Sequence, residues 1–245
     1  MNMMSQWYQA SECKQVMFVV SAPEEKELIK KLGHPEEILA MTGLARYDTL
    51  DPGKTENMIL VMPTWRQYLA GCSGDEFKES EFFRLFDGLI HSEKIAKILE
   101  ETDHTMVFYP HVEMQKWDVF RSNNPRIRIG SFKTDDVQDL LNRAEILVTD
   151  YSSVYFDVSY MEKDIVFWQF DKDKAETQHY EGYAFDMARF GAVTKTLEET
   201  EDAIREALTH PGKRKKEQHE FFEYHDRHNC ERIFNEVWKR VTGPA

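Results

Sequence analysis

Three short apolar stretches of the sequence are each followed by side chains that could bind an anion. The stretches are residues 58–62, 105–109 and 146–149. The side chains that follow them are Pro63, Thr64 and Arg66; Pro110 and His111; and, directly after Thr149, Asp150, Ser152 and Ser153. Arginine offers a planar fork of donors that matches phosphate, and hydroxyl and imidazole groups add single donors. The pattern favours one anionic ligand.

The segment after Thr149 has two interpretations. Ser152 and Ser153 precede a helix-like stretch at 152–162, and serine is a common helix cap, so one interpretation is a well-capped helix. The other is a phosphate cradle, because a helix N-terminus combines free N–H donors with a positive dipole. The sequence has no GxGxxG and no GxxxxGK[ST] at this point, so neither a dinucleotide fingerprint nor a P-loop is predicted.

His111, Arg66 and Arg46 also have alternatives. His111 follows Pro110 at a strand end, where it could hydrogen-bond a phosphate or protonate a leaving group, although a lone histidine is usually structural or solvated. Arg66 could bind phosphate or form a surface salt bridge beside a buried Trp65. For Arg46 and Asp48, two residues apart, we expect an ion pair with each other.

The apolar stretches alternate with helix-like segments along the chain. The strands are predicted at 16–21, 58–62, 105–109, 126–129, 146–149 and 165–170, and the helices after Pro23 and near 78–101, 136–143, 152–162, 196–209 and 214–241. Short continuous apolar strands separated by helices indicate a parallel sheet covered on both faces. We therefore predict an α/β, doubly wound fold, in which ligands bind beyond the carboxyl ends of the strands.

Composition excludes several classes of function. The chain has 245 residues and a formal net charge of −13, which argues against nonspecific nucleic-acid binding. Its three cysteines and the spacing of His219, His225 and His228 match no zinc pattern, so no metal site is predicted. The sequence has no signal-peptide core and no apolar run near the roughly 20 residues that span a bilayer. We expect a cytoplasmic protein whose membrane contact, if any, is peripheral.

Taken together, the motifs resemble a known family. TGLARYDTL, ILVMPTWR, VFYPH and DVQDLLNRAEILVTDYSSVYFDVSYMEKDIVFWQFD, in this order, are similar to the CDP-glycerol glycerophosphotransferases of teichoic-acid and capsule synthesis. The likeness covers about residues 16–190 and is most specific around TDYSSVYFD. It implies a two-domain GT-B architecture with Rossmann-like halves. Residues 1–40 would be the tail end of the N-terminal domain, and residues 41–245, with a final helix near 214–241, the C-terminal donor-binding domain.

The resemblance also implies the chemistry and the roles of residues. A hydroxyl of a polyol-phosphate or lipid-linked polymer attacks the β-phosphorus of CDP-glycerol, and CMP leaves. Residues 63–66 and Pro110 would line the donor site, and residues 149–154 would hold the pyrophosphate. Asp135 and Asp136 would lie near the nucleoside, and His111 would stabilise the phosphate or the departing CMP. No tightly bound cofactor is implied, and no carboxylate cluster marks a site for a divalent metal ion.

The chain departs from the family pattern in two places that keep alternatives open. The family's Trp-His-Gly-Thr segment, whose histidine is the favoured general base, is absent from this sequence. Glu181 stands where a basic residue is common, which leaves ribitol or another polyol open. One alternative function is a GT-B glycosyltransferase that uses a nucleotide sugar, and another is a catalytically silent nucleotide-binding module.

Overall fold

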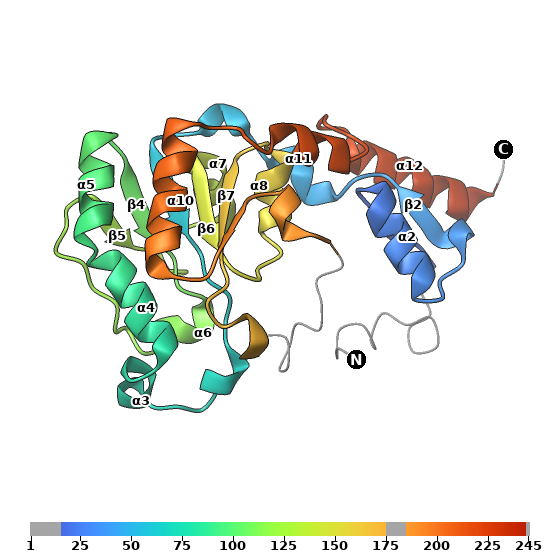
Figure 1. Cartoon of the computed structure of the whole chain (residues 1–245). Coiled ribbons are helices and arrows are strands. Elements are labelled where there is room, and N and C mark those ends of the chain that lie inside the picture. Colours follow the sequence, from blue (N-terminus) through green and yellow to red (C-terminus); the bar gives the residue numbers. More distant parts are fainter. Residues whose placement is uncertain (1–15, 175–184, 244–245) are drawn as a thin grey trace.

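Six parallel strands form the central sheet of the protein (Figure 1). The computed structural model describes residues 16–174 and 185–243, so Glu181 lies outside the described residues. The strands lie in the order β5 (Ile127–Ile129), β4 (Thr105–Phe108), β3 (Met58–Val61), β6 (Ile146–Thr149), β7 (Asp164–Trp168) and β8 (Ala192–Thr194). When these six strands are numbered 1 to 6 along the chain, their spatial order is 3-2-1-4-5-6, which is the order of a Rossmann fold. The predicted α/β, doubly wound fold is confirmed.

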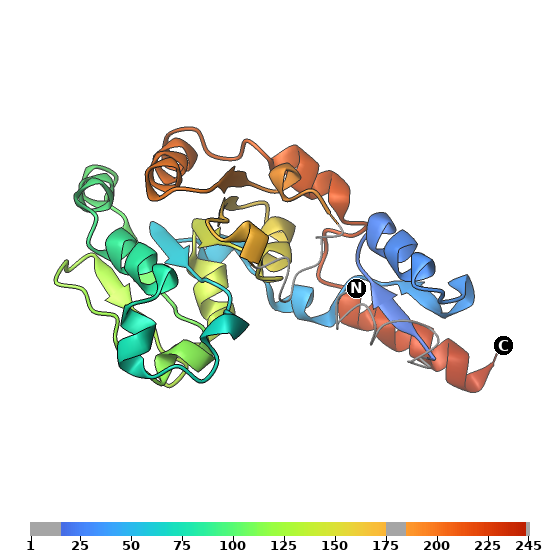
Figure 2. The same cartoon turned by 60° about the horizontal axis from the view of Figure 1, so that its bottom comes forward.

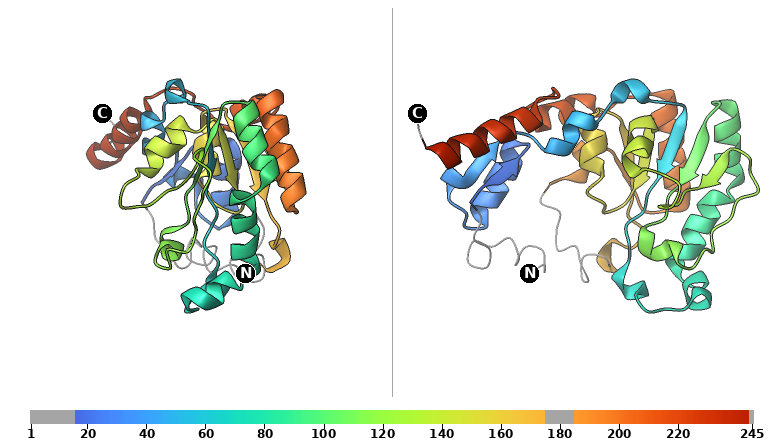
Figure 3. Two further views of the ribbon diagram at one scale, coloured as in Figure 1. Left: turned by 90° about the vertical axis from the view of Figure 1, so that its left-hand side faces the viewer. Right: turned by 180° about the vertical axis from the view of Figure 1, so that it is seen from behind.

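Helices cover both faces of the sheet, as the two halves of Figure 3 show. Alternate strand residues, such as Ile59 and Leu60, point into two separate apolar cores. One core contains side chains of α4 (Glu81–Ile90), α5 (Glu93–Glu101) and α10 (Leu197–Thr209). The other contains side chains of α7 (Val137–Arg143), α8 (Tyr155–Tyr160) and α11 (Lys215–Phe221). Both faces of the inner strands β3, β4, β6 and β7 are buried, so these strands are mostly apolar, whereas the edge strands β5 and β8 have exposed residues.

Two of the predicted helices are divided in the structure. The helix expected at 78–101 is α3 (Gly74–Lys78), α4 and α5, because Ser80 and Ser92 each accept a hydrogen bond from the N–H three residues on and so begin a new helix. The helix expected at 214–241 is α11 followed by α12 (Asn229–Thr242), with a loop at 222–228 between them. A short helix, α6 (Val112–Gln115), follows β4.

A second, smaller sheet lies to one side of the first. It consists of β1 (Phe18–Val20) and β2 (Leu39–Met41), which pair in parallel, with α2 (Pro23–Lys31) between them. Helix α12 extends from the body to this small sheet (Figures 1 and 2). Short 3-10 turns complete the described chain at Glu36–Ile38, Ala45–Thr49, Pro52–Lys54, Gln67–Leu69 and Met187–Arg189. In the described part of the chain, no helix is both long and apolar enough to cross a membrane.

The expected pairing of Arg46 with Asp48 is wrong. Arg46 Nε instead donates to Asp157 Oδ1 at 2.6 Å. The Asp48 carboxylate accepts from the backbone N–H groups of Asn229 and Cys230, at 2.9 and 2.7 Å, and so caps the start of α12. Gly43, with φ of +74°, precedes this junction, and a Cβ there would lie 1.8 Å from Asn229 Oδ1, so only glycine fits.

Candidate functional site

The loops after β3 and β6 meet at the point where the strand order of the sheet reverses. The two strands are neighbours, and their connections run in opposite directions across the sheet. Ligands of doubly wound folds bind at such a switch point, outside the carboxyl ends of the strands. The two loops are joined here because the Thr149 hydroxyl donates to the Met62 carbonyl at 2.7 Å. Residues 63–66 and 150–153, predicted as site residues, therefore lie side by side.

Arg66 is the centre of a buried ion cluster at this switch point. Its side chain is 2% exposed, its Nε donates to Asp171 Oδ2 at 2.7 Å, and its Nη2 lies 2.8 Å from Asp150 Oδ2. Its Nη1 donates to the Thr64 carbonyl at 2.9 Å. Burial opposes the charged form, but the two carboxylates raise the pKa of Arg66 above its usual value. The guanidinium is thus a fixed cation that connects the loops after β3, β6 and β7.

Asp150 fixes the same loops through its other contacts. Its carboxylate accepts from the Thr64 backbone N–H at 2.9 Å, from the Thr64 hydroxyl at 2.6 Å and from the Tyr151 N–H at 2.5 Å. Thr64, Arg66 and Asp150 are therefore brought together, and they bind one another. Arg66 was considered for a surface salt bridge; it does form an ion pair, but the predicted surface position is wrong because the pair is buried. Asp171 was not selected from the sequence, although it directly follows the strand-like run at 165–170.

Ser152 and Ser153, which follow the end of β6, have hydrogen-bond donors that are not used within the described residues. Helix α8 begins at Tyr155, three residues later than predicted, and neither hydroxyl caps it. The N–H groups of Tyr155 and Phe156 bond to the carbonyls of the two serines. Within the described residues, no hydrogen bond is donated by the backbone N–H of Ser152 or Ser153, or by the exposed Ser153 hydroxyl. These groups are donors with free capacity at the switch point.

An open cavity of about 650 Å³ lies beside Ser153. Asp135 and Asp136 line it together with Tyr109 and Asp157, and Arg46 lies on its rim. The structure thus brings three predicted site residues into one cavity. Tyr109 and Arg46 were not selected from the sequence, although Tyr109 is the last residue of the apolar run before Pro110 and Arg46 belongs to the TGLARYD motif.

Both aspartates of the cavity are already bonded within the protein. Asp136 is the N-cap of α7, and its carboxylate accepts from the Asp139 N–H at 2.8 Å. Asp135 accepts from the Ser131 N–H and pairs with Arg128, both at 2.9 Å. Burial opposes ionisation of Asp135, but these partners lower its pKa below the usual value. Each carboxylate therefore shapes the cavity wall as well as facing the cavity.

His111 caps the short helix α6. Its Nδ1 accepts from the Glu113 N–H at 3.3 Å, and its ring stacks beside Trp65 with 6.4 Å between ring centroids. Burial lowers the pKa of His111 below its ordinary value, so the neutral ring is favoured. With Nδ1 as the acceptor, the proton of the neutral ring lies on Nε2, which is left as a donor. Pro110 lies in a neighbouring cavity of about 320 Å³ with Arg121 and Ser131.

Comparison with known proteins decides which family these loops belong to. The pattern of the CDP-glycerol:poly(glycerophosphate) glycerophosphotransferases matches residues 25–239, which includes all the loops described above. The chain belongs to this family. Over 248 residues it is 26% identical to the minor teichoic acid biosynthesis protein GgaB of Bacillus subtilis (strain 168), covering 95% of this chain and 27% of that protein.

Another relative and two solved structures extend the comparison. A teichoic acid poly(glycerol phosphate) polymerase of Bacillus spizizenii is 23% identical over 191 residues, which are 76% of this chain and 44% of that protein. The wall teichoic acid polymerase TagF has the same fold, with a TM-score of 0.69 at 17% identity over 97% of this chain and 60% of its own. MnaA of S. aureus, solved with UDP, matches with a TM-score of 0.59 at 14% identity over 93% of this chain and 61% of its own. The family member described here thus spans only part of each of these proteins.

Proposed function

We propose that this member of the glycerophosphotransferase family binds CDP-glycerol and supplies the donor half of a transferase. The transferase moves glycerol phosphate, or a related polyol phosphate, to a hydroxyl of a cell-surface polymer and releases CMP. The observation that carries the proposal is a set of N–H and hydroxyl donors at Ser152 and Ser153 that have no acceptor among the described residues, beside the 650 Å³ cavity that Ser153 lines. A structure of a TagF variant has also been solved after a soak with CDPG, which supports the choice of ligand.

The residues divide into two roles in this proposal. The N–H and hydroxyl groups of Ser152 and Ser153 donate to the diphosphate, and His111 Nε2–H donates to a phosphate oxygen or to the departing CMP. Arg66 and Asp150 do not touch the ligand, because their hydrogen-bonding groups already bind each other and the loops. They hold the loops after β3 and β6 in position. Positioning of this kind, together with stabilised charge, is the main contribution of a protein to phosphoryl transfer.

The transfer itself is a balanced displacement at phosphorus. The bond from the acceptor oxygen to the β-phosphorus forms while the bond from that phosphorus to the CMP oxygen breaks. The proton of the acceptor hydroxyl goes to a general base, a role that we assign to no residue of this chain. The described strand-end loops provide donors for the phosphate charge, so the chain supplies the leaving-group side of the reaction.

We also infer that the small sheet belongs to a second domain. A two-stranded sheet is only marginally stable by itself, and α12 beside it exposes Phe234, Trp238 and Val241. Arg232 and Arg240 of α12 donate to the carbonyls of Thr42 and Val16 at 3.0 and 3.4 Å, so the helix contacts this unit along its length, while Asp48 of the larger unit caps its start. In this proposal the N-terminal unit expected at residues 1–40, of which 1–15 lie outside the described residues, includes α12. Residues 43–228 then form the donor-binding domain.

We place the activity in the cytoplasm, where a nucleotide-linked donor is available. Contact with the inner membrane face through the basic run 213–216 gains little support. Lys213 pairs with Glu206, and Lys216 lies 3.7 Å from Glu220, so part of this charge is balanced within the protein. A cationic patch needs several unbalanced lysines or arginines to hold an anionic surface.

Calorimetric titration with CDP-glycerol, CDP, CMP and UDP-glucose tests the donor assignment. We expect cytidine ligands to bind, with affinity reduced about 10- to 100-fold in Ser152→Ala/Ser153→Ala and about 10-fold in His111→Ala, since each loses a hydrogen bond to a charged group. His210→Ala, at an exposed histidine on α10's C-terminal end, is the control and should bind like the parent.

Two outcomes would contradict the assignment. Tighter binding of UDP-glucose than of CDP-glycerol would favour the nucleotide-sugar glycosyltransferase, a candidate supported by the shared fold of MnaA, which was solved with UDP. Unchanged binding in both variants would mean that the ligand lies elsewhere on the protein. Far-ultraviolet circular dichroism of each variant shows whether it is folded before it is titrated.

A further inference from the structure

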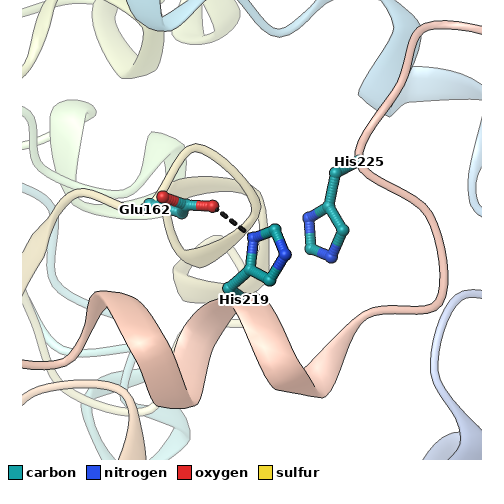
Figure 4. A group of neighbouring side chains, drawn as sticks. All are labelled: Glu162, His219 and His225. Atoms are coloured by element: carbon teal, nitrogen blue, oxygen red, sulfur yellow. Dashed lines mark hydrogen bonds and ion pairs between the residues drawn. The ribbon is translucent and has the colours of Figure 1, made fainter.

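Glu162, His219 and His225 form a compact cluster away from the strand-end loops (Figure 4). Glu162 follows α8 and has a positive φ of 56°, His219 is on α11, and His225 is in the loop between α11 and α12. His219 Nδ1 lies 2.7 Å from Glu162 Oε1, and the two imidazole rings stack with 3.7 Å between centroids. One possible ligand atom from each residue lies within 4.8 Å of the other two.

The neighbours of His225 hold its ring in this position. Tyr160 of α8 stacks on it with 6.1 Å between centroids and an angle of 16° between the rings, and His219 covers it at 8°. The Tyr160 hydroxyl also donates to the carbonyl of Asp226, the next residue, at 2.7 Å. Contacts from α8 and α11 thus fix the His225 ring next to His219.

We propose that Glu162, His219 and His225 bind a divalent transition-metal ion of the Zn²⁺ type. Two imidazoles and one carboxylate are a ligand set that suits Zn²⁺, with water completing the coordination. Tetrahedral bonds of about 2.0–2.1 Å place ligand atoms about 3.3 Å apart, so separations of up to 4.8 Å close with small movements. The imidazole lone pairs lie in the ring planes, so the exposed His219 ring turns out of the stack to point at the ion, while His225 keeps its place beside Tyr160. Both histidines are exposed, which leaves room for this rotation.

The position of the cluster gives the ion a structural consequence. It joins the end of α8, which packs on the central sheet, to α11 and to the loop that leads into α12. Helix α12 extends from there to the small sheet (Figure 1). A bound ion therefore restrains the segment at which the chain passes from one unit to the other. The inference is independent of the donor site, because it uses none of the strand-end residues.

Titration of the chain with Zn²⁺ and with Mg²⁺ tests the site. The cysteines are first replaced in a Cys13→Ser/Cys72→Ser/Cys230→Ser background, because thiolates bind zinc. We expect one Zn²⁺ per chain, and no Mg²⁺ at the same concentration, since Mg²⁺ prefers oxygen ligands. His219→Ala and His225→Ala should each weaken Zn²⁺ binding by more than about 10-fold, and Glu162→Gln by about 10-fold. The melting temperature should rise with Zn²⁺ in the parent and not in His225→Ala.

Matched histidines provide the controls. His210 and His228 are also exposed. His210, at the end of α10, pairs with Glu206 of that helix, and His228, at the start of α12, pairs with Glu231 in its first turn. His210→Ala and His228→Ala should leave the affinity and the stoichiometry unchanged. Equal losses in these controls, or weak binding of several ions with no loss in His219→Ala, would overturn the proposal. A second readout is the imidazole nitrogen chemical shifts, which should move on addition of Zn²⁺ for His219 and His225 and stay fixed for His210.

Discussion

Two arginine–carboxylate pairs lie within the same half of the molecule and differ in what surrounds them. Arg66 is 2% exposed and pairs with two buried carboxylates, Asp150 and Asp171. Arg46 has a side chain that is 50% exposed and pairs with Asp157, which is 9% exposed, on the rim of the open cavity. The first cluster is buried, whereas the second has a charged group next to solvent and to the open cavity.

The difference distinguishes charged residues that hold loops in position from charged residues that are exposed to a cavity. A buried polar group must find its partners inside the protein, so the guanidinium nitrogens of Arg66 are occupied by hydrogen bonds to the loops after β3, β6 and β7. A group at an open rim can exchange partners when a ligand arrives. A charge at the end of a strand therefore does not by itself indicate ligand contact. Substitutions in the buried cluster should change stability first, and those at the rim should change stability less and in a pH-dependent way.

Replacing Arg66 by methionine should give the largest effect. The substitution leaves Asp150 and Asp171 buried without their cation, which typically costs about 3–5 kcal/mol. The measurement is urea unfolding, in which the midpoint should fall with an unchanged dependence on urea concentration. Arg121→Met, which breaks an exposed pair with Asp118, is the control and should change stability by no more than about 0.5 kcal/mol. A loss below about 1 kcal/mol for Arg66→Met would mean that the buried cluster does not stabilise the fold.

Replacing Arg46 by methionine should have a smaller effect that depends on pH. It removes the partner of Asp157, and an unsatisfied buried acceptor costs about 1–3 kcal/mol. Burial already raises the pKa of Asp157 even with Arg46 present. The folded state therefore holds a proton to higher pH than the unfolded state does, so stability falls as pH rises through the raised pKa.

The expected result for Arg46→Met is a loss that is larger at pH 8 than at pH 5. Urea unfolding at both pH values measures it. In the double variant Arg46→Met/Asp157→Asn the extra loss at pH 8 should disappear, because no carboxyl group remains to titrate. If the single variant loses the same stability at both pH values, the protonation of Asp157 is not the cause.

The sequence predicted the central strands because they are buried on both faces. β3, β4, β6 and β7 have four or five residues each, of which at least three in a row are apolar and buried. β2 and β8 were not predicted, because β2 (LAM) has no β-branched or aromatic residue and β8 (AVT) is mostly exposed. Ser80 and Ser92, inside a long helix-like stretch, are the N-caps that divide it. Their role as caps depends on a change in the direction of the helix axis, and the local pattern of apolar residues does not indicate where that change occurs.

The meeting of the loops after β3 and β6 was predictable from the sequence, but the bonds within this candidate site were not. Strand-end residues could be placed at one edge of a sheet because parallel strands share their carboxyl edge. The partner of Arg66 at Asp171 is 105 residues away, so no local pattern connects them. The pairing of Arg46 with Asp48 failed for a geometric reason. These residues lie two apart in a 3-10 turn, where side chains at this spacing do not face each other.

At the cavity wall, Asp136 provides a finer test of the distinction between support and recognition. Asp136→Ala removes the N-cap of α7 and should cost about 1 kcal/mol, measured by thermal unfolding. Asp136→Ser keeps a capping oxygen and should restore most of that stability. If the carboxylate also contacts the nucleoside, both variants should lose CDP-glycerol affinity equally. If Asp136 only supports the helix, affinity should remain unchanged in Asp136→Ser.

The smallest expected effect is the titration of His111. Burial lowers its pKa in the folded protein, so the neutral ring contributes stability that is present above the unfolded value near 6.5 and is lost as pH falls through the folded pKa. Protonation also removes Nδ1 as the acceptor for the Glu113 N–H. Proton NMR of the His111 ring measures this pKa, and His111→Gln identifies the resonance.

Ligand binding should move the same resonance in a direction that identifies the contact. A diphosphate beside Nε2 stabilises the charged imidazolium, so CDP-glycerol should raise the pKa of His111 from its lowered value. By linkage, the affinity for CDP-glycerol should then increase as pH falls from 7 toward 5.5 in the parent, and this pH dependence should be weaker in His111→Gln. An unchanged pKa with ligand bound would remove His111 from the phosphate contacts and leave it as the cap of α6, a supporting residue like Arg66.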